Sequence, residues 1–103
     1  MNLKLDADGF LRDQGDWNPS VAEELARREN VKLTDDHWRV LEGLRSFHRR
    51  TEVVPAMRPF VKMVKDEVDE RLGTSTELMV LFGGSPAKMA AKIAGLPRPT
   101  NCL

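Results

Sequence analysis

The feature that most constrains this fold is a helix-start signal followed by an apolar stripe, which recurs along the chain. Asn18-Pro19 and Ser85-Pro86 each place an N-cap side chain before a proline, which the first helical position tolerates. Thr34 and Ser75 are further N-cap candidates. Apolar residues then recur at every third or fourth position, as one buried helix face requires. The spacing predicts helices over 19–30, 35–50, 76–82 and 86–94.

A further helix is expected between Pro55 and Leu72, where apolar residues again recur at helical spacing. Pro59 lacks a backbone N–H and would clash with the carbonyl four residues earlier if this helix began at Pro55. We therefore expect either a kink at Pro59 or a start near Arg58. Gly73 is the expected end, since glycine readily follows the last helical turn.

The N-terminus has a different pattern. Leu3-Lys4-Leu5 alternates apolar and polar residues, Asp8-Gly9 suits a tight turn, and Phe10-Leu11 resumes the apolar character. These segments predict a short β-hairpin.

The 103 residues are enough for one core and too few for two. A single domain over residues 1–103 is expected, mostly helical.

Charge limits the choice of partners. Sixteen Lys and Arg balance sixteen Asp and Glu, so no global positive field would draw the chain to nucleic acid or to an anionic membrane. Residues 37–65 nevertheless carry seven basic side chains against two acidic ones. This basic block is either a solvated helix face or a docking surface for an acidic partner or an RNA backbone.

Cysteine usage points to a compartment. A single cysteine cannot form an internal disulfide, which favours a reducing cytosol. The chain also has no signal-peptide pattern and no apolar run that approaches a membrane span. We therefore expect a cytoplasmic protein that does not enter a membrane.

The lone cysteine, Cys102, is the penultimate residue of the segment 96–103, in which two prolines favour an extended, flexible arm. Such a position is hard to bury. The eight residues could extend ~25 Å, enough for the thiol to enter a partner's cleft. A thiol with no second cysteine could accept a sulfane sulfur from one protein's persulfide and present it to another. The C-terminal carboxylate should disfavour its thiolate, and three cations on the same part of the chain could offset that effect. These cations, which we also expect to bind a partner, are Lys88, Lys92 and Arg98.

Other chemistry is weakly supported. His37 and His48 would lie ~16 Å apart on one helix, too far to share a metal. His37, in the first helical turn beside Trp38, suits packing or capping. Gly83-Gly84-Ser85 could bind an anion before a helix, but it lacks the wider nucleotide-binding pattern. No metal site and no cofactor are expected.

The C-terminal segment resembles the arm of the DsrC/TusE family of sulfur-relay proteins. It reads Gly95-Leu96-Pro97-Arg98-Pro99-Thr100 and then has the penultimate cysteine. Other residues follow the family's order along nearly the whole chain: Asp8-Gly9-Phe10-Leu11, Trp17, Leu33-Thr34, His37-Trp38, Arg45, Pro55-Ala56, Arg58 and Leu81-Phe82. The resemblance implies an α+β, mostly helical fold, with an N-terminal hairpin or meander packed on an orthogonal array of about five helices and a swinging arm.

The family divides by its cysteines. Members that serve dissimilatory sulfite reductase carry a second cysteine eleven residues before the penultimate one, and here that position is Ala91. The single thiol is similar to the TusE branch, which takes persulfide sulfur from a Tus complex and passes it to the enzyme that thiolates the wobble uridine of tRNA. The resemblance therefore implies that Cys102 is the persulfide site.

The sequence is compatible with three functions. The first is a sulfurtransferase-type carrier, rather than a stand-alone enzyme, working between a Tus-type donor complex and a tRNA thiolase. The second is an accessory protein that docks into dissimilatory sulfite reductase or another sulfur-oxidation enzyme. The third is a regulatory or nucleic-acid-binding module built on the basic block, although no direct nucleic-acid contact is expected of a carrier. A monomer is expected, with a Cys102 disulfide dimer forming on oxidation.

Overall fold

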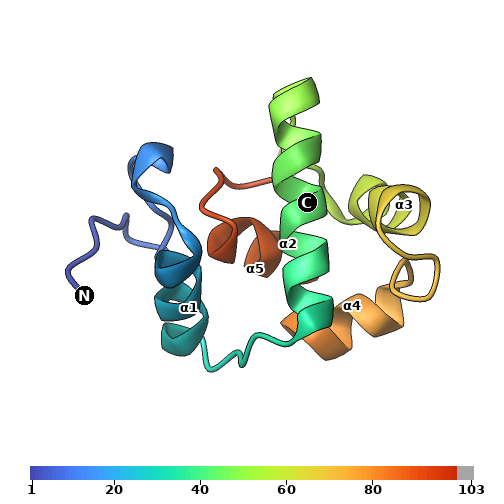
Figure 1. Ribbon diagram of the computed structural model, residues 1–103, viewed down its shortest axis with the longest axis horizontal. Coiled ribbons are helices and arrows are strands. Elements are labelled where there is room, and N and C mark those ends of the chain that lie inside the picture. Colours follow the sequence, from blue (N-terminus) through green and yellow to red (C-terminus); the bar gives the residue numbers. More distant parts are fainter. Residues whose placement is uncertain (100–103) are drawn as a thin grey trace.

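The computed structural model describes residues 1–99 of the chain (Figure 1). A 3-10 helix, η1 (Gln14–Asp16), precedes five α-helices. In chain order these are α1 (Pro19–Arg28), α2 (Asp35–Thr51), α3 (Met57–Glu67), α4 (Ser75–Phe82) and α5 (Pro86–Ile93). The prediction of about five helices is confirmed within this part of the chain.

Most helices start where their cap chemistry predicts. Asn18 caps α1 by accepting the Val21 N–H at 2.9 Å, and Pro19 takes the first helical position. Thr34 caps α2 in a reciprocal box with His37. The cap of α4 is Thr74 rather than Ser75, because the Thr74 hydroxyl accepts the Glu77 N–H. Ser85 precedes α5 without a side-chain capping bond, so Pro86 alone marks that start.

α3 is shorter than expected at its C-terminal end. It begins at Met57, which puts Pro59 at the third helical position, where a missing N–H leaves no hydrogen bond unmade. The expected continuation to Leu72 is wrong, since the helix ends at Glu67. The Asp69 carboxylate accepts the Arg71 N–H and holds a turn there, in competition with the helix.

The predicted β-hairpin is not formed. Residues 1–99 contain no strand, only an isolated antiparallel bridge between Leu5 and Leu11. The ladder cannot lengthen because the Asp13 side chain accepts the Gly15 N–H and starts η1 directly after it. Phe10 and Leu11 are also buried consecutively, which breaks the alternation that a strand with one buried face needs. The described fold is therefore helical.

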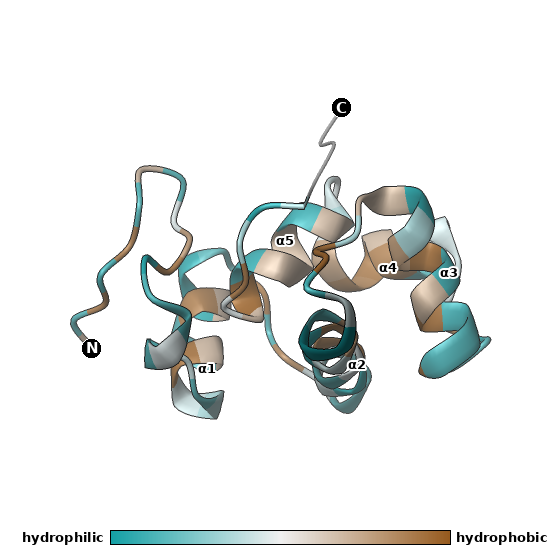
Figure 2. Cartoon of the chain, turned by 90° about the horizontal axis from the view of Figure 1, so that it is seen from above, coloured by the Kyte–Doolittle hydropathy of each residue, from teal (hydrophilic) through white to brown (hydrophobic). Residues whose placement is uncertain are grey.

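α5 is the innermost helix, and it packs against each of the other four α-helices. In Figure 2, α5 lies between α1 on one side and α3 and α4 on the other, with α2 seen nearly end-on beneath it. Ala90 and Ala91 are fully buried in α5, and such small side chains let neighbouring helices approach closely. The larger side chains of the same buried cluster are Leu41, Leu44, Phe60, Leu72, Leu78 and Phe82.

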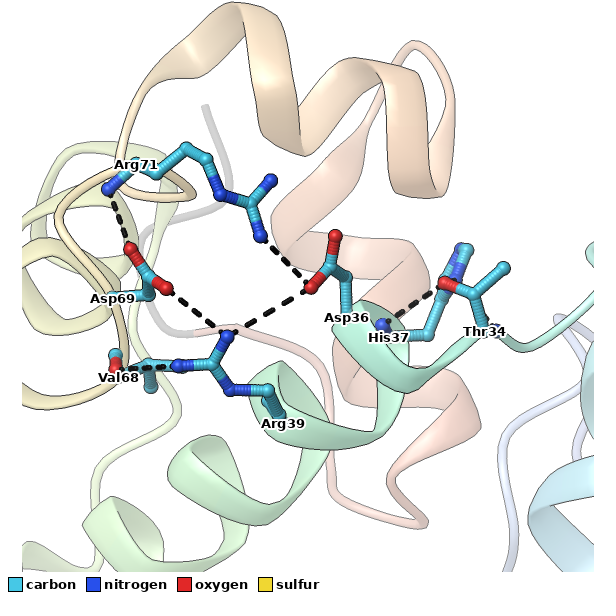
Figure 3. Close-up of polar contacts among 7 residues, drawn as sticks. All are labelled: Thr34, Asp36, His37, Arg39, Val68, Asp69 and Arg71. Carbon is cyan, nitrogen blue, oxygen red and sulfur yellow. Dashed lines mark hydrogen bonds and ion pairs between the residues drawn. The ribbon is translucent and has the colours of Figure 1, made fainter.

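The start of α2 is joined to two other parts of the fold, and Figure 3 shows its contacts with the first of them, the segment after α3. Arg39 bonds Asp69 at 3.0 Å and Arg71 bonds Asp36 at 3.0 Å, which ties α2 to the segment after α3. His37 Nε2 lies 2.6 Å from the Leu81 carbonyl, so it is the protonated nitrogen, and Nδ1 accepts the Thr34 N–H. The predicted capping and packing role of His37 is confirmed.

Candidate functional site

The C-terminal segment leaves the innermost helix through a tight backbone turn at Gly95. The Gly95 N–H donates to the Lys92 carbonyl at 3.1 Å and the Leu96 N–H to the Ala91 carbonyl at 2.9 Å, which is the Schellman arrangement. Gly95 has φ +74°, a conformation that glycine adopts at little cost. Leu96 is only 3% exposed. The segment is therefore rooted in the core rather than at the surface.

Two side chains from distant parts of the chain close over this turn, and we call Trp17 and Arg45 the root clamp. The Trp17 indole N–H donates to the Ile93 carbonyl at 2.9 Å, and Arg45 Nη1 donates to the Ala94 carbonyl at 2.7 Å. The Arg45 guanidinium also stacks 3.8 Å above the Trp17 ring. The clamp thus satisfies carbonyls that the end of α5 would leave without donors, and it places a cation at the negative end of the helix.

Beyond Leu96, the segment contacts the N-terminal turn, residues 6–10. Arg98 pairs with Asp6 at 3.3 Å and with Asp8, and its guanidinium lies 4.8 Å from the centre of the Phe10 ring. Asp6 also holds the turn itself, since its carboxylate accepts the N–H groups of Asp8 and Phe10. The turn is therefore held in a shape in which the carboxylates of Asp6 and Asp8 both face Arg98.

These contacts shift the pKa values of both partners. The hydrogen bond from the Phe10 N–H is the largest cause that lowers the pKa of Asp6, and Arg98 adds to it. The Asp8 carboxylate raises the pKa of Arg98. Both shifts favour the charged forms, so the contact is an ion pair at neutral pH. The side chains of Arg98 and Asp8 are nevertheless about half exposed, and salt will screen the pair.

The remaining cations predicted for the site lie apart from one another. Lys92 is buried at 8% exposure on α5, where its ammonium bonds Glu29 at 3.2 Å and lies 5.4 Å from the Phe10 ring. Lys88 is exposed on the same helix and has no ion pair with any described residue. Lys92 and Arg98 therefore meet at Phe10, whereas Lys88 has no charged partner among residues 1–99.

Cys102, the predicted persulfide residue, lies outside the described residues. Within residues 1–99, no three His, Cys, Asp or Glu side chains are placed to hold a metal ion together. No helix of that part has the length and apolar character to cross a bilayer. What the described structure supplies is the origin of the arm: a buried root at Gly95, followed by an ionic contact at Arg98.

The partners of the segment were not identified from the sequence. From the sequence, Trp17 is a residue in the family's order, Arg45 is such a residue and part of the basic block, and Asp6 has no role. Arg98 and Asp6 are ninety-two positions apart, and Trp17 and Ile93 are seventy-six apart. The sequence does show two aspartates, Asp6 and Asp8, beside a glycine turn and an arginine, Arg98, near the C-terminus. Their opposite charges indicate attraction, but they do not predict that these residues are in contact.

Known proteins similar to this chain include sulfurtransferases. Sulfurtransferase TusE of Buchnera aphidicola subsp. Acyrthosiphon pisum (strain APS) is 42% identical over 102 residues, covering 99% of this chain and 90% of that protein. Sulfurtransferase TusE of Yersinia pestis is 41% identical over 101 residues, covering 98% of this chain and 93% of that protein. The chain is therefore similar to these proteins over almost its full length.

Solved structures of DsrC proteins are also similar to this chain over almost its full length. The NMR structure of Allochromatium vinosum DsrC is 37% identical with a TM-score of 0.87, covering 96% of this chain and 88% of that one. The oxidized gamma-subunit of the dissimilatory sulfite reductase (DsrC) from Archaeoglobus fulgidus is 39% identical with a TM-score of 0.84, covering all of this chain and 94% of that one. The family model described as DsrC like protein matches residues 1–103. With this match over the whole chain and these relatives, the chain belongs to the DsrC/TusE family.

Proposed function

We propose that this protein is a sulfur carrier that accepts a persulfide sulfur on Cys102 and passes it to a partner in tRNA 2-thiouridine synthesis. The observation that carries the proposal is the single thiol at the end of a segment rooted in α5, in a chain 42% identical to a sulfurtransferase TusE. The rooted turn fixes where the arm starts, and the cysteine comes seven residues after Gly95.

The chemistry is a thiol–persulfide exchange that needs no added oxidant. The Cys102 thiolate attacks the outer sulfur of a donor persulfide, a new S–S bond forms, and the old one breaks with the donor leaving as a thiolate. An acceptor thiolate then attacks the outer sulfur on Cys102 and releases the Cys102 thiolate. Sulfur moves at the same oxidation level in both steps, so the carrier returns to its starting state.

The partners follow from the same proposal. A Tus-type complex would supply the sulfur and a tRNA thiolase would accept it, in the cytoplasm and with the carrier as a monomer. Under oxidising conditions two copies would join through Cys102, which blocks the thiol. Catalysis belongs to the partners, since the carrier contributes one nucleophile and the recognition surface.

A second candidate is an accessory role beside dissimilatory sulfite reductase. It is favoured by the similarity to the DsrC structures, one of which is named as a gamma-subunit of that enzyme. Against it stands Ala91, which occupies the position of the second family cysteine and is fully buried in α5. A thiol is absent there, so chemistry that needs two cysteines on one chain is excluded.

The deciding experiment is intact-mass analysis after incubation with a persulfide donor. The wild-type chain should gain ~32 Da, one sulfur atom, and Cys102→Ala should gain nothing. Transfer to a purified tRNA thiolase, measured as loss of that increment, would support the first candidate. Transfer only in the presence of sulfite reductase would favour the second, and a wild-type chain that gains no mass would rule out both.

A further inference from the structure

A surface cavity of about 470 Å³ lies between the start of α1 and one face of α2. Both tryptophans of the chain line it, Trp17 from before α1 and Trp38 from α2. Each is half-buried. The rest of the lining is Pro19, Glu42, Arg45 and Arg49. Tryptophan and arginine are the residue types that contribute most of the energy at protein interfaces, and here four such side chains share one concave site.

The arginines of this cavity differ from most others in the chain. Six of the ten arginines form ion pairs with carboxylates: Arg27, Arg28, Arg39, Arg50, Arg71 and Arg98. Arg45 and Arg49 have no carboxylate partner among residues 1–99. Glu42 is on the same helix face, yet it forms no ion pair with either of them in that part of the chain. The site therefore carries uncompensated positive charge beside two apolar rings.

Arg45 and Arg49 also repel each other. Burial lowers the pKa of Arg45, and the charge of Arg49 lowers it further. A carboxylate placed between the two guanidinium groups would remove that repulsion and could bind them through charge-assisted hydrogen bonds. Arg49 is exposed and stands at the rim, whereas Arg45 is half-buried against Trp17.

We propose that this cavity is a docking surface for an acidic segment of a partner protein, with a carboxylate between Arg45 and Arg49 and an apolar side chain against the indoles. The identity of that partner as a sulfur donor or acceptor rests on the proposed function. The cavity adjoins the root of the arm, because Arg45 donates to Ala94 and Trp17 donates to Ile93. A partner bound there would sit beside the origin of the segment that ends in Cys102.

A protein fits this site better than RNA does. An RNA backbone is bound by a row of cations that neutralises successive phosphates. The cavity offers two arginines, and Glu42 adds a negative charge to its edge. The other two arginines of α2, Arg39 and Arg50, are paired with Asp69 and Glu67, so they do not extend the site into a row of free cations. An acidic peptide needs one or two carboxylate contacts together with an apolar surface, which is what the cavity provides.

The two tryptophans give a direct measurement, since both indoles of the chain line this cavity. Poly-L-glutamate added at low salt should change the emission saturably, and Arg49→Glu should weaken the apparent affinity by about 10-fold or more. The matched control is Arg58→Glu on α3, an exposed arginine that also has no ion pair with a described residue. It should bind as the wild type does.

Three results would overturn the proposal. One is the absence of a saturable change in emission, and another is an equal loss in Arg49→Glu and Arg58→Glu, which would show attraction by overall charge. The third is tighter binding of tRNA than of poly-L-glutamate, lost in Arg49→Glu, which would make the site a nucleic-acid surface. Unfolding midpoints by circular dichroism should match among the variants, because both arginines are exposed.

Sulfur transfer separates this proposal from the function it rests on. With a donor protein, Arg49→Glu should need about 10-fold more donor for half-maximal labelling of Cys102, while labelling by a small-molecule persulfide stays unchanged. A wild-type chain that binds poly-L-glutamate but is never labelled would reject the carrier function and leave the docking surface intact. Equal donor requirements in wild type and Arg49→Glu would reject the docking surface for that donor.

Discussion

Two parts of the C-terminal segment are held by different kinds of contact. The root, residues 93–96, is fixed by hydrogen bonds from Trp17 and Arg45 to buried carbonyls and by its own Schellman turn. Two residues later, Arg98 is held by ion pairs with half-exposed carboxylates. The first set is shielded from solvent, whereas the second is weakened by salt and acid. The segment thus has a fixed origin and a releasable contact close to it.

The largest expected effect is at the root, from Gly95→Ala. A Cβ there would lie 2.3 Å from Cδ1 of Trp17, at φ +74°. The free energy of unfolding should fall by roughly 2–4 kcal/mol, from the unfavourable φ and the overlap together. Urea denaturation should show a lower midpoint with an unchanged slope.

The matched control for this change lies in the N-terminal turn. Gly9 has φ +89°, but a Cβ there would come no closer than 3.6 Å to any neighbour. Gly9→Ala should therefore cost only ~1–2 kcal/mol, the part that comes from backbone conformation. If both alanine variants lose the same stability, the close packing of Trp17 on Gly95 is not a constraint on the fold.

The next effect is expected from Trp17→Phe, which leaves the buried Ile93 carbonyl without its donor. The loss should be about 1–3 kcal/mol beyond that of Trp38→Phe, since an unsatisfied buried carbonyl keeps its desolvation penalty. The Trp38 indole makes no hydrogen bond with a described residue, so Trp38→Phe measures the stability that is lost through the smaller ring alone. Thermal denaturation of the two variants would test this, and equal midpoints would contradict it.

A smaller effect is expected from Arg98→Gln, which removes the ionic contact. Hydrogen exchange of the Leu96 amide, bonded to Ala91, should keep its wild-type protection. The unfolding midpoint should move less than in Trp17→Phe, because exposed ion pairs contribute little. A loss of Leu96 protection as large as in Trp17→Phe would show that the two parts of the segment are coupled.

The smallest effect is a change in the titration of Asp6. Its folded pKa is lowered from the ordinary 3.8, so the contact with Arg98 stabilises the fold above pH 3.8 and is lost as the pH falls through the lower value. In Arg98→Gln the pKa should rise only part of the way to 3.8, because the Phe10 hydrogen bond is the larger cause. Carbon NMR of the Asp6 carboxyl would measure it, and a full return to 3.8 would assign the shift to Arg98 alone.

The sequence predicted elements that depend on local chemistry. Asn18 and Thr34 cap their helices as expected, and Pro59 lies at a helix start, because each effect acts within one turn. The hairpin prediction was wrong, since alternation over three residues could not outweigh the η1 turn that follows. The end of α3 depends on the Asp69 turn and its pairing with Arg39 from α2, which local spacing does not reveal.

The site could be predicted only in its outline. The motif at the end of the chain predicts an arm and supplies its charged residues. Their partners depend on packing, since α5 must lie between α1 and α2 before Trp17 and Arg45 can meet at Ala94. The bond from Lys92 to Glu29 likewise joins residues far apart in the sequence. Contacts that form only in the assembled fold have no regular residue spacing in the sequence from which they could be predicted.

The central position of α5 has a consequence for how the protein matures on the ribosome. α1 to α4 all bury side chains against a helix that is translated after them. Until residues 86–93 emerge, α2 and α3 can pack on each other, but α1 and α4 lack the helix that each of them contacts most. Nascent chains will therefore expose apolar faces that chaperones can bind. Completion of the globule and synthesis of the residues that follow α5 are thus almost simultaneous, so an unfinished chain would not carry the C-terminal segment on a folded body.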